Sequence, residues 1–409
     1  MALTGLDLTD PDRYLTGVPH EDFALLRARA PVYYHPDPQA GGFWALTRHA
    51  DVVRVSRDPE TFSSYARSCM LWEPDDEALA RQRLMMLNLD PPDHTRLRGL
   101  VNRGFTPRMV GRLEERIEAI SVDIVDRAVE RGECDFVTAV AAELPLAVIA
   151  ELMGVPHEDR RRIFTWSNRM IGSGDAEYGT SPADGTDAAA EILNYAAALG
   201  ERKRRCPADD IVSKLAGPDE GGKELSELEF GMFFVLLAVA GNETTRNAIS
   251  GGMLALVEHP DQWARLKADR TLLATAADEI VRWVSPITQF RRTALRDAEV
   301  AGQPIRQGEK VVMFYPSANR DESVFADPDA FDIARSPNPH VGFGGGGPHF
   351  CLGSHLARLE IQVMFRTLLH RVDRVELAAG ETRRLRSNFI NGIKEMPVRL
   401  VAAESPPAV

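Results

Sequence analysis

The residues best suited to chemistry surround a single cysteine near the carboxyl end of the chain. Residues 343–353 read Phe-Gly-Gly-Gly-Gly-Pro-His-Phe-Cys-Leu-Gly, with the sulfur at Cys351. Glycine has no Cβ atom, so its backbone can lie very close to a neighbouring group, and a flat macrocycle over the sulfur would be such a group. The loop is therefore consistent with a haem whose iron takes a cysteine thiolate as axial ligand, which favours oxygenation chemistry. A buried free cysteine in a glycine-rich turn is the alternative that this loop alone leaves open.

A long apolar stretch in the middle of the chain carries start and stop signals for one helix. Ser226 followed three residues later by Glu229 is a capping-box pattern, and Pro260 after His259 marks the far end. These signals predict a helix of about 34 residues, on the order of 50 Å long. A helix of that length crosses the whole molecule.

The apolar pattern of this helix is interrupted at residues 240–245, which read Ala-Gly-Asn-Glu-Thr-Thr. Burying a carboxylate and two hydroxyls in a core helix is costly, and Gly241 lowers helix propensity by about 1 kcal/mol. We therefore expect a functional kink, in which Ala240 and Gly241 leave room for a flat ligand or dioxygen. Thr244 would hold a water, and Glu243 would relay protons from solvent. A solvent-facing polar patch is the alternative, which the apolar run before it disfavours.

Two further pairs have spacings that bring their side chains to one face of a helix. Glu279 and Arg282 are three residues apart, and His94 and Arg98 are four apart. The second pair would present two donors to a carboxylate or a phosphate. Exposed pairs of this kind are common and contribute little to stability, so each pair is also compatible with an ordinary solvated helix face.

The composition is typical of a soluble globular protein. The 409 residues include 48 basic and 60 acidic side chains, for a net charge of −12, which argues against nucleic acid as a partner. The four cysteines have no regular spacing, so neither a disulfide framework nor a zinc site is predicted. No signal peptide is visible, and the longest apolar run, 230–240, is shorter than the roughly 20 residues that cross a bilayer. We expect a cytoplasmic protein without a membrane anchor.

The spacing of apolar residues predicts a mainly α fold with small β-sheets. Helical spacing dominates between residues 92 and 270, for example in segments 109–131 and 189–205. Shorter segments have strand-like patterns. The expected strands are 42–46, which precedes a helix and predicts a small amino-terminal sheet, and 298–302, 309–315 and 397–401.

Taken together, and in their order along the chain, the four motifs resemble those of the cytochrome P450 family. That family carries a His or Trp with an Arg four residues later, then an Ala/Gly-Gly-x-Asp/Glu-Thr segment, then Glu-x-x-Arg, and finally a Phe-x-x-Gly-x-x-x-Cys-x-Gly loop that binds haem. All four occur here, over nearly the full length of the chain, the last with one residue too many. The resemblance implies the P450 fold, one haem domain over residues 1–409, a long central helix that crosses the haem, and monooxygenase activity.

The resemblance also implies roles for individual residues. Cys351 corresponds to the thiolate ligand of haem b, and Glu243 and Thr244 to the acid and alcohol that deliver protons during oxygen activation. The expected structural cluster comprises Glu279, Arg282 and Arg335. The residues expected at the cofactor are His94, Arg98, Arg292 and His349, which would hold the propionates, and Ala240, Phe343 and Gly353. The expected pocket, mostly apolar as suits a lipid or terpenoid, comprises Val239, Ala240, Val284, Ile287, Thr288, Phe389 and Ile390.

The cysteine loop departs from the family pattern in one place. Phe343 stands eight residues before Cys351 instead of seven, with Gly344 at the usual position, so one glycine is extra. Relatives that share this variant loop include actinobacterial enzymes that hydroxylate the terminal carbon of methyl-branched lipids and of the cholesterol side chain. Segments 317–322, 338–343 and 391–394 are similar to the same relatives. We therefore expect hydroxylation of an unactivated C–H bond of a methyl-branched lipid, a terpenoid or a steroid side chain.

The resemblance implies that electrons come from separate chains, a ferredoxin and a ferredoxin reductase, with dioxygen as the second substrate. Arg103, Arg108 and Arg112 are candidate contacts for the ferredoxin, although a solvated helix face would look the same. Segments 72–76 and 172–187 are rich in turn residues and are expected to gate substrate access. Two alternatives stay open: a tailoring oxidase of polyketide, terpene or peptide biosynthesis, and a haem-binding sensor without turnover.

Overall fold

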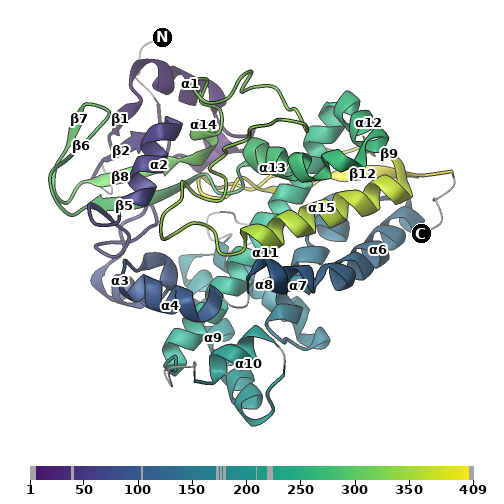
Figure 1. Cartoon of the computed structure of the whole chain (residues 1–409), viewed down its shortest axis with the longest axis horizontal. Helices are drawn as coiled ribbons and strands as arrows, with labels where there is room; N and C mark the ends of the chain where they lie inside the picture. The colour runs from purple at the N-terminus through teal and green to yellow at the C-terminus, as the bar shows by residue number, and fades with distance from the viewer. Residues whose placement is uncertain are drawn as a thin grey trace.

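The protein is built mainly from helices, with small sheets at two ends (Figure 1). The computed structural model describes residues 6–37, 41–102, 105–171, 175, 177, 181–208, 210–218 and 224–404. The helices are α1 (His20–Arg29), α2 (His49–Arg57), α3 (Asp76–Gln82), α4 (Asp93–Asn102), α5 (Pro107–Gly111), α6 (Glu114–Arg131), α7 (Glu143–Leu152), α8 (Arg160–Ile171), α9 (Pro182–Arg205), α10 (Ile211–Ala216), α11 (Glu227–Glu258), α12 (Pro260–Ala268), α13 (Leu273–Val284), α14 (Tyr315–Ala318) and α15 (Ser354–Arg371). This composition confirms the expected mainly α fold.

The strands form one larger sheet and three smaller groups in the part of the chain that the structure describes. They are β1 (Val32–His35), β2 (Phe43–Leu46), β3 (Phe62–Ser63), β4 (Glu133–Asp135), β5 (Gln289–Ala294), β6 (Ala298–Val300), β7 (Gln303–Ile305), β8 (Lys310–Phe314), β9 (Val372–Leu377), β10 (Arg383–Arg384), β11 (Ile393–Glu395) and β12 (Pro397–Ala402). The larger sheet has the order β1-β2-β8-β5-β3, and only its β2–β8 pair is parallel. All four predicted strands are therefore present, with ends shifted by one or two residues.

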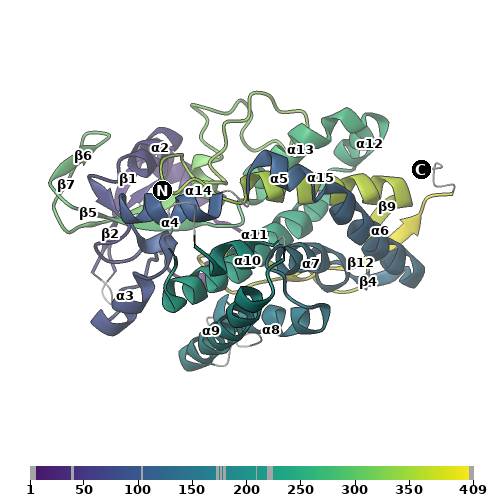
Figure 2. The same ribbon diagram turned by 60° about the horizontal axis from the view of Figure 1, so that its bottom comes forward.

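Helix α11 is the central element of the fold. It runs for 32 residues, its amino end carries the predicted capping box of Ser226 and Glu229, and it ends at Glu258 with His259 as its C-cap. Helices α7, α8, α9, α13 and α15 pack around it, and Figures 1 and 2 both show it in the middle of the helical half of the molecule. The main hydrophobic core fills the spaces between these helices. The length and the position of α11 confirm the prediction of one long central helix.

Two helix boundaries differ from the sequence-based prediction. The segment 109–131 is not one helix, because α5 ends at Gly111 and α6 begins at Glu114. Gly111 is the last residue of α5, which is followed by the C-cap Arg112, and the short helix has its own N-cap at Thr106. Helix α9 begins at Pro182, earlier than expected, with Ser181 as its cap. None of the described helices is long and apolar enough to cross a membrane.

Candidate functional site

The cysteine loop is closed by its own backbone and leads directly into a helix. The Cys351 N–H donates to the Phe343 carbonyl at 2.9 Å, and α15 begins three residues later, with Gly353 at its cap. A Cβ atom at Gly353 would meet no atom of the described chain within 4 Å. Burial raises the pKa of the Cys351 thiol, whereas the Gly353 N–H and the charges of Arg98 and Arg358 act in the opposite direction. The helix amino terminus and these cations provide a setting in which a thiolate is stabilised once it binds a cation.

Two glycines of this loop, Gly345 and Gly346, lie against helix α2. A Cβ atom at Gly345 would lie 2.9 Å from the Ser56 side chain, and one at Gly346 would lie 2.8 Å from Nε of Arg57. Both neighbours belong to the last turn of α2. Gly346 also has φ +89°, in the left-handed region that favours glycine. The expectation that these glycines make room for a macrocycle is therefore wrong for these positions, because they let the loop pack against α2.

Four donor groups predicted to hold an anion gather next to the cysteine loop. The rings of His94 and His349 lie 4.3 Å apart between centroids. Burial, together with the charges of Arg98 and Arg292, lowers the pKa of His94 to about 4 and that of His349 to about 2. Both imidazoles are therefore neutral at pH 7, and they stand beside two permanently charged guanidinium groups.

These two guanidinium groups have no carboxylate partner among the described residues. Arg98 donates only to the Pro348 carbonyl, at 3.1 Å, and Arg292 donates to the carbonyl of Arg291, at 2.8 Å. His94 is 2% exposed, and its Nδ1 has no hydrogen-bond partner within the described ranges. Partly buried charges are normally paired. The unsatisfied donors therefore fit an anionic group, and the two carboxylates of a haem are of that kind.

The middle of α11 has an open surface within an otherwise buried helix. Ala240 is exposed and Thr244, one turn later, is partly exposed, although the helix before and after them is buried. The Thr244 hydroxyl donates back to the Ala240 carbonyl at 2.8 Å. Helical geometry continues through this segment, so the helix is not broken there. Gly241 was expected to leave room for a flat ligand or dioxygen, and this expectation was wrong. A Cβ atom at Gly241 would lie 2.9 Å from Ile149 of α7, so the glycine instead allows α11 and α7 to pack.

Glu243 has one cationic partner, which sequence reasoning missed. Its carboxylate forms an ion pair with Arg246, one turn further along α11, and the amide of Asn242 lies 3.5 Å from it. Arg246 also donates to Asn168 on α8 at 3.1 Å, while its Nε has no partner in the described part of the chain. Burial raises the pKa of Glu243, and the charge of Arg246 opposes this shift. The i,i+3 spacing that drew attention to Glu279 and Arg282 would also have identified Arg246.

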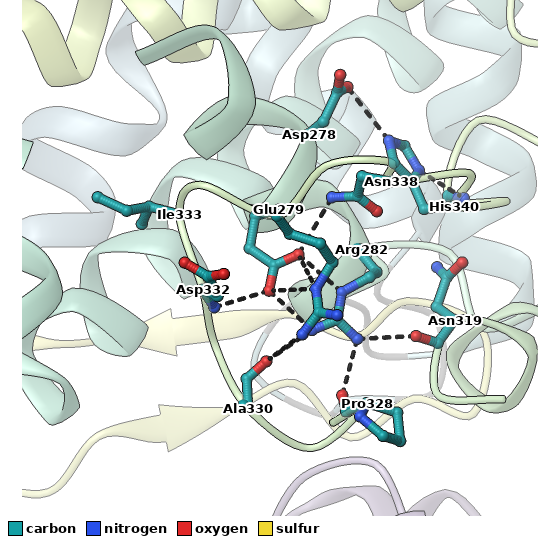
Figure 3. Close-up of polar contacts among 12 residues, drawn as sticks. Asp278, Glu279, Arg282, Asn319, Pro328, Ala330, Asp332, Ile333, Asn338 and His340 are labelled. Carbon is teal, nitrogen blue, oxygen red and sulfur yellow. Dashed lines mark hydrogen bonds and ion pairs between the residues drawn. The ribbon is translucent and has the colours of Figure 1, made fainter. Parts of the chain in front are cut away.

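The predicted structural cluster is assembled in the interior (Figure 3). Arg282 donates to Glu279 through two bonds of 2.8 Å, and Arg335 Nε lies 3.2 Å from the same carboxylate. Asn338 and the backbone N–H of Asp332 also donate to Glu279. The remaining guanidinium donors of Arg282 bind the carbonyls of Asn319, Pro328 and Ala330. Glu279 and Arg282 are both fully buried, so these residues are not the solvated pair that was the alternative.

The predicted pocket residues fall into two groups. Val239, Ala240, Ile287 and Phe389 are partly or fully exposed, whereas Val284, Thr288 and Ile390 are buried. Val284 packs against α11, where a Cβ atom at Gly251 would lie 2.8 Å from it. The Thr288 hydroxyl donates to the Phe389 carbonyl at 3.1 Å, and Ile287 and Ile390 form an isolated β-bridge. The structure thus joins the turn after α13 to the segment around Phe389.

Described residues of both segments expected to gate substrate access form ion pairs. Glu73 contacts Arg291 at 2.8 Å and Lys310 at 3.0 Å. Of the segment 172–187, most of the residues before 181 lie outside the described part. Asp175 and Glu177 are described, and both contact Lys394, at 2.9 and 3.1 Å.

The candidate ferredoxin contacts are only partly described. Arg108 and Arg112 are exposed, and Arg103 lies outside the described residues. Arg108 lies on α5 and Arg112 directly follows it.

Comparisons with known proteins agree with the fold. Residues 195–386 match the family model described as "Cytochrome P450". The chain is 49% identical over 403 residues to a "Steroid C26-monooxygenase" of Rhodococcus jostii, covering 96% of this chain and 84% of that protein. It is 45% identical over 386 residues to a "Methyl-branched lipid omega-hydroxylase" of Mycobacterium tuberculosis, covering 92% and 90%. A Mycobacterium marinum cytochrome P450 solved in complex with pseudoionone has a TM-score of 0.90 and 41% identity, covering 97% and 99%.

The chain belongs to the cytochrome P450 family, and it is a P450 monooxygenase. This confirms the resemblance drawn from the four motifs and removes the alternative of a sensor without turnover. Membership implies a haem cofactor with cysteine thiolate ligation, and a need for dioxygen and electron donors. The individual site residues stay predictions.

Proposed function

We propose that Cys351 is the axial ligand of a haem b, and that His94, Arg98, Arg292 and His349 hold its propionates. The main support is the group of unsatisfied donors beside the cysteine loop, in which two guanidinium groups lack a carboxylate partner among the described residues. A dianionic ligand would complete these hydrogen bonds with charge-assisted ones. We place all of this in a single haem domain of residues 1–409.

The bound haem would supply activation of dioxygen and insertion of one oxygen atom into a C–H bond. The chain's own residues would control protons and access on the α11 side. Glu243 is buried with a raised pKa, so it can hold a proton at its carboxyl group away from bulk water. Thr244 is partly exposed at the open surface of α11, and its hydroxyl can both accept and donate a hydrogen bond. We assign Glu243 and Thr244 to proton delivery on this basis.

We propose an apolar lipid or a steroid side chain as the substrate. The relatives named as steroid C26-monooxygenase and methyl-branched lipid omega-hydroxylase are 49% and 45% identical to this chain over most of its length. The partly exposed residues among the predicted pocket positions, Val239, Ala240, Ile287 and Phe389, are all apolar. Such walls suit a hydrocarbon chain or ring system. The reaction would be hydroxylation of an unactivated C–H bond at the end of that chain.

We propose a ferredoxin and its reductase as the electron donors. The exposed Arg108 and Arg112 would contribute to an interface for an acidic ferredoxin. We also propose a cytoplasmic location, which is supported by four free cysteines, Cys69, Cys134, Cys206 and Cys351.

The proposal is tested first at the cofactor. The reduced, carbon monoxide-treated holoprotein should show the red-shifted Soret band of a haem-thiolate protein, and Cys351→Ser should lose it. Arg98→Met and Arg292→Met should each bind haem more weakly, measured by the transfer of haem to apomyoglobin. A Cys351→Ser protein that keeps the red-shifted band would refute the ligand assignment.

The substrate is tested by spectral shifts that report displacement of water from the haem iron. Cholestenone and methyl-branched fatty alcohols should produce the shift at low concentration and should be hydroxylated in a reconstituted system. Polyketide and peptide candidates should not. The opposite pattern would favour a tailoring oxidase of natural-product biosynthesis.

A further inference from the structure

Three side chains from three separate segments meet beside the cysteine loop. Asp278 lies on α13, His340 lies just before the loop, and Arg358 lies on α15. Arg358 Nε donates to the Asp278 carboxylate at 2.6 Å, and His340 Nε2 lies 3.2 Å from the same oxygen. Figure 3 shows the contact with His340 next to the Glu279–Arg282 cluster. Asp278 is therefore the point at which the loop, α13 and α15 are joined.

The hydrogen bonds indicate which nitrogen of His340 carries the proton and whether Asp278 is ionised. The Gly342 N–H donates to His340 Nδ1 at 3.2 Å, so Nδ1 is an acceptor and Nε2 carries the proton that His340 donates to Asp278. Burial alone would raise the pKa of Asp278, but the bonds from His340 and Arg358 hold it below its ordinary value. Asp278 is therefore an ionised acceptor of two hydrogen bonds.

The two partners of Asp278 both contact Phe343. The Arg358 guanidinium carbon lies 4.4 Å from the centroid of the Phe343 ring, and the His340 ring lies 5.6 Å from it between centroids. The Phe343 carbonyl in turn accepts the Cys351 N–H. The loop is also seated directly on α13, since a Cβ atom at Gly342 would lie 2.6 Å from Val281. A continuous series of contacts thus runs from Asp278 to the residue that carries the sulfur.

We propose that Asp278 is a positioning residue for the Cys351 ligand, acting by holding His340 and Arg358 against Phe343. The inference rests on the proposed function, because it requires Cys351 to bind the iron. The loop has one residue more than the family pattern and a run of four glycines, which lose much conformational freedom when they are fixed. A loop of this kind needs an anchor outside itself. Asp278 provides that anchor through charge rather than through packing alone.

The experiment measures how long the holoprotein keeps its thiolate ligand. Reduced, carbon monoxide-bound wild-type protein is warmed, and the red-shifted Soret band is followed as it converts to the blue-shifted band of the protonated or displaced thiol. Asp278→Asn keeps the shape of the side chain and removes its charge, so it should convert about tenfold faster, as expected for the loss of charge-assisted hydrogen bonds. Arg358→Met should convert faster as well. The double variant should be little worse than either single one, because both substitutions break the same contact.

The matched control is Asp126→Asn. Asp126 pairs with Arg371 at 2.9 Å, and Arg371 is the last residue of α15, at the opposite end from Cys351. This variant removes the same kind of pair from the same helix and should convert at the wild-type rate. Equal rates for Asp278→Asn and Asp126→Asn would overturn the inference, as would additive effects of Asp278→Asn and Arg358→Met.

A failure of Asp278→Asn to fold and a failure of the haem-ligand assignment can each be told apart from a failure of the inference. If Asp278→Asn does not yield folded protein, His340→Leu carries the test: it leaves α13 intact and should convert about threefold faster through the loss of one hydrogen bond, and a wild-type rate would overturn the inference. If wild-type protein shows no red-shifted band, or Cys351→Ser retains it, the proposed function fails and not merely the role of Asp278.

Discussion

Two buried acid–arginine pairs with the same helical spacing differ in how completely they are satisfied. Glu279 and Arg282 on α13 have side chains that are 0% exposed, and Glu243 and Arg246 on α11 are nearly as buried, at 2% and 4%. Glu279 accepts bonds from Arg282, Arg335, Asn338 and the Asp332 backbone. Among the described residues, Glu243 has only Arg246 and a distant Asn242 amide as partners. Two pairs with the same spacing and similar burial thus have very different hydrogen-bond partners.

The difference indicates what each pair is for. A buried charge that is completely hydrogen-bonded is rigid and expensive to change, whereas one with few partners can exchange them at lower cost. The α13 pair joins α13 to the segment that carries Asn319, Pro328 and Ala330, so its role is structural. The α11 pair lies next to the open surface at Ala240 and Thr244, where an acid that can release and take up a proton is useful.

The largest effect is expected from breaking the α13 pair. Arg282→Met removes the donor to Glu279 and to three carbonyls, and it leaves a carboxylate buried with fewer partners. We expect a loss of about 3–5 kcal/mol in the free energy of unfolding, measured by thermal denaturation followed by circular dichroism. The control is Arg265→Met, which breaks an exposed pair with Asp332 of 2.9 Å and should cost less than about 1 kcal/mol. Similar losses in the free energy of unfolding for both variants would show that the α13 cluster stabilises the fold no more than an exposed ion pair does.

Breaking the α11 pair should affect turnover more than stability. Glu243→Gln keeps an acceptor for Arg246 but cannot give up a proton, so we expect hydroxylation to fall roughly 100-fold, while the free energy of unfolding changes by about 1 kcal/mol. Product formation in a reconstituted system and denaturation together measure both quantities. Glu258→Gln, at the exposed end of the same helix, should leave turnover unchanged. A Glu243→Gln enzyme with wild-type turnover would exclude Glu243 from proton delivery.

A smaller effect is expected at Thr244, because its hydroxyl donates to a helix carbonyl and carries no charge. Thr244→Ala should still consume dioxygen but yield about tenfold less hydroxylated product per dioxygen, measured with an oxygen electrode and product analysis. Thr244→Ser keeps the hydroxyl and should restore most of the coupling. If Ala and Ser at this position gave the same yield, the hydroxyl would have no part in the reaction.

The comparison also explains which features the sequence could predict. The capping box of α11 and the Glu279–Arg282 pair are set by residues three apart, so local spacing was sufficient to find them. The partner of Gly345 is Ser56 on α2, and the partner of Asp278 is Arg358, 80 residues away. Such contacts depend on how distant segments pack. No local pattern encodes them, so the contacts of Gly345 and Gly346 with α2 could not be predicted from the sequence.

A third buried acid, Glu360 on α15, extends the comparison to an acid with an unsatisfied carboxyl oxygen among the described residues. It is 3% exposed, and its Oε2 has no hydrogen-bond partner among the described residues. Burial raises the pKa of Glu360 well above its ordinary value of 4.5, so the folded protein keeps a proton that the unfolded chain releases. The free energy of unfolding should therefore fall as the pH rises from about 4.5 toward the folded-state pKa.

Glu360→Gln replaces the acid with a neutral side chain of the same shape and should remove this pH dependence. We expect the variant to be more stable than wild type near pH 8 and this difference to shrink toward pH 5, measured by urea denaturation at both values. Glu376→Gln is the control, since bonds from Arg374 lower the pKa of Glu376 and its contribution is already constant above about pH 5. Parallel curves for wild type and Glu360→Gln would mean that Glu360 is ionised in the folded protein. In that case a buried water or a similar partner would have to hydrogen-bond the Glu360 carboxylate. Glu360 would then resemble Glu279, as a buried carboxylate whose charge is satisfied.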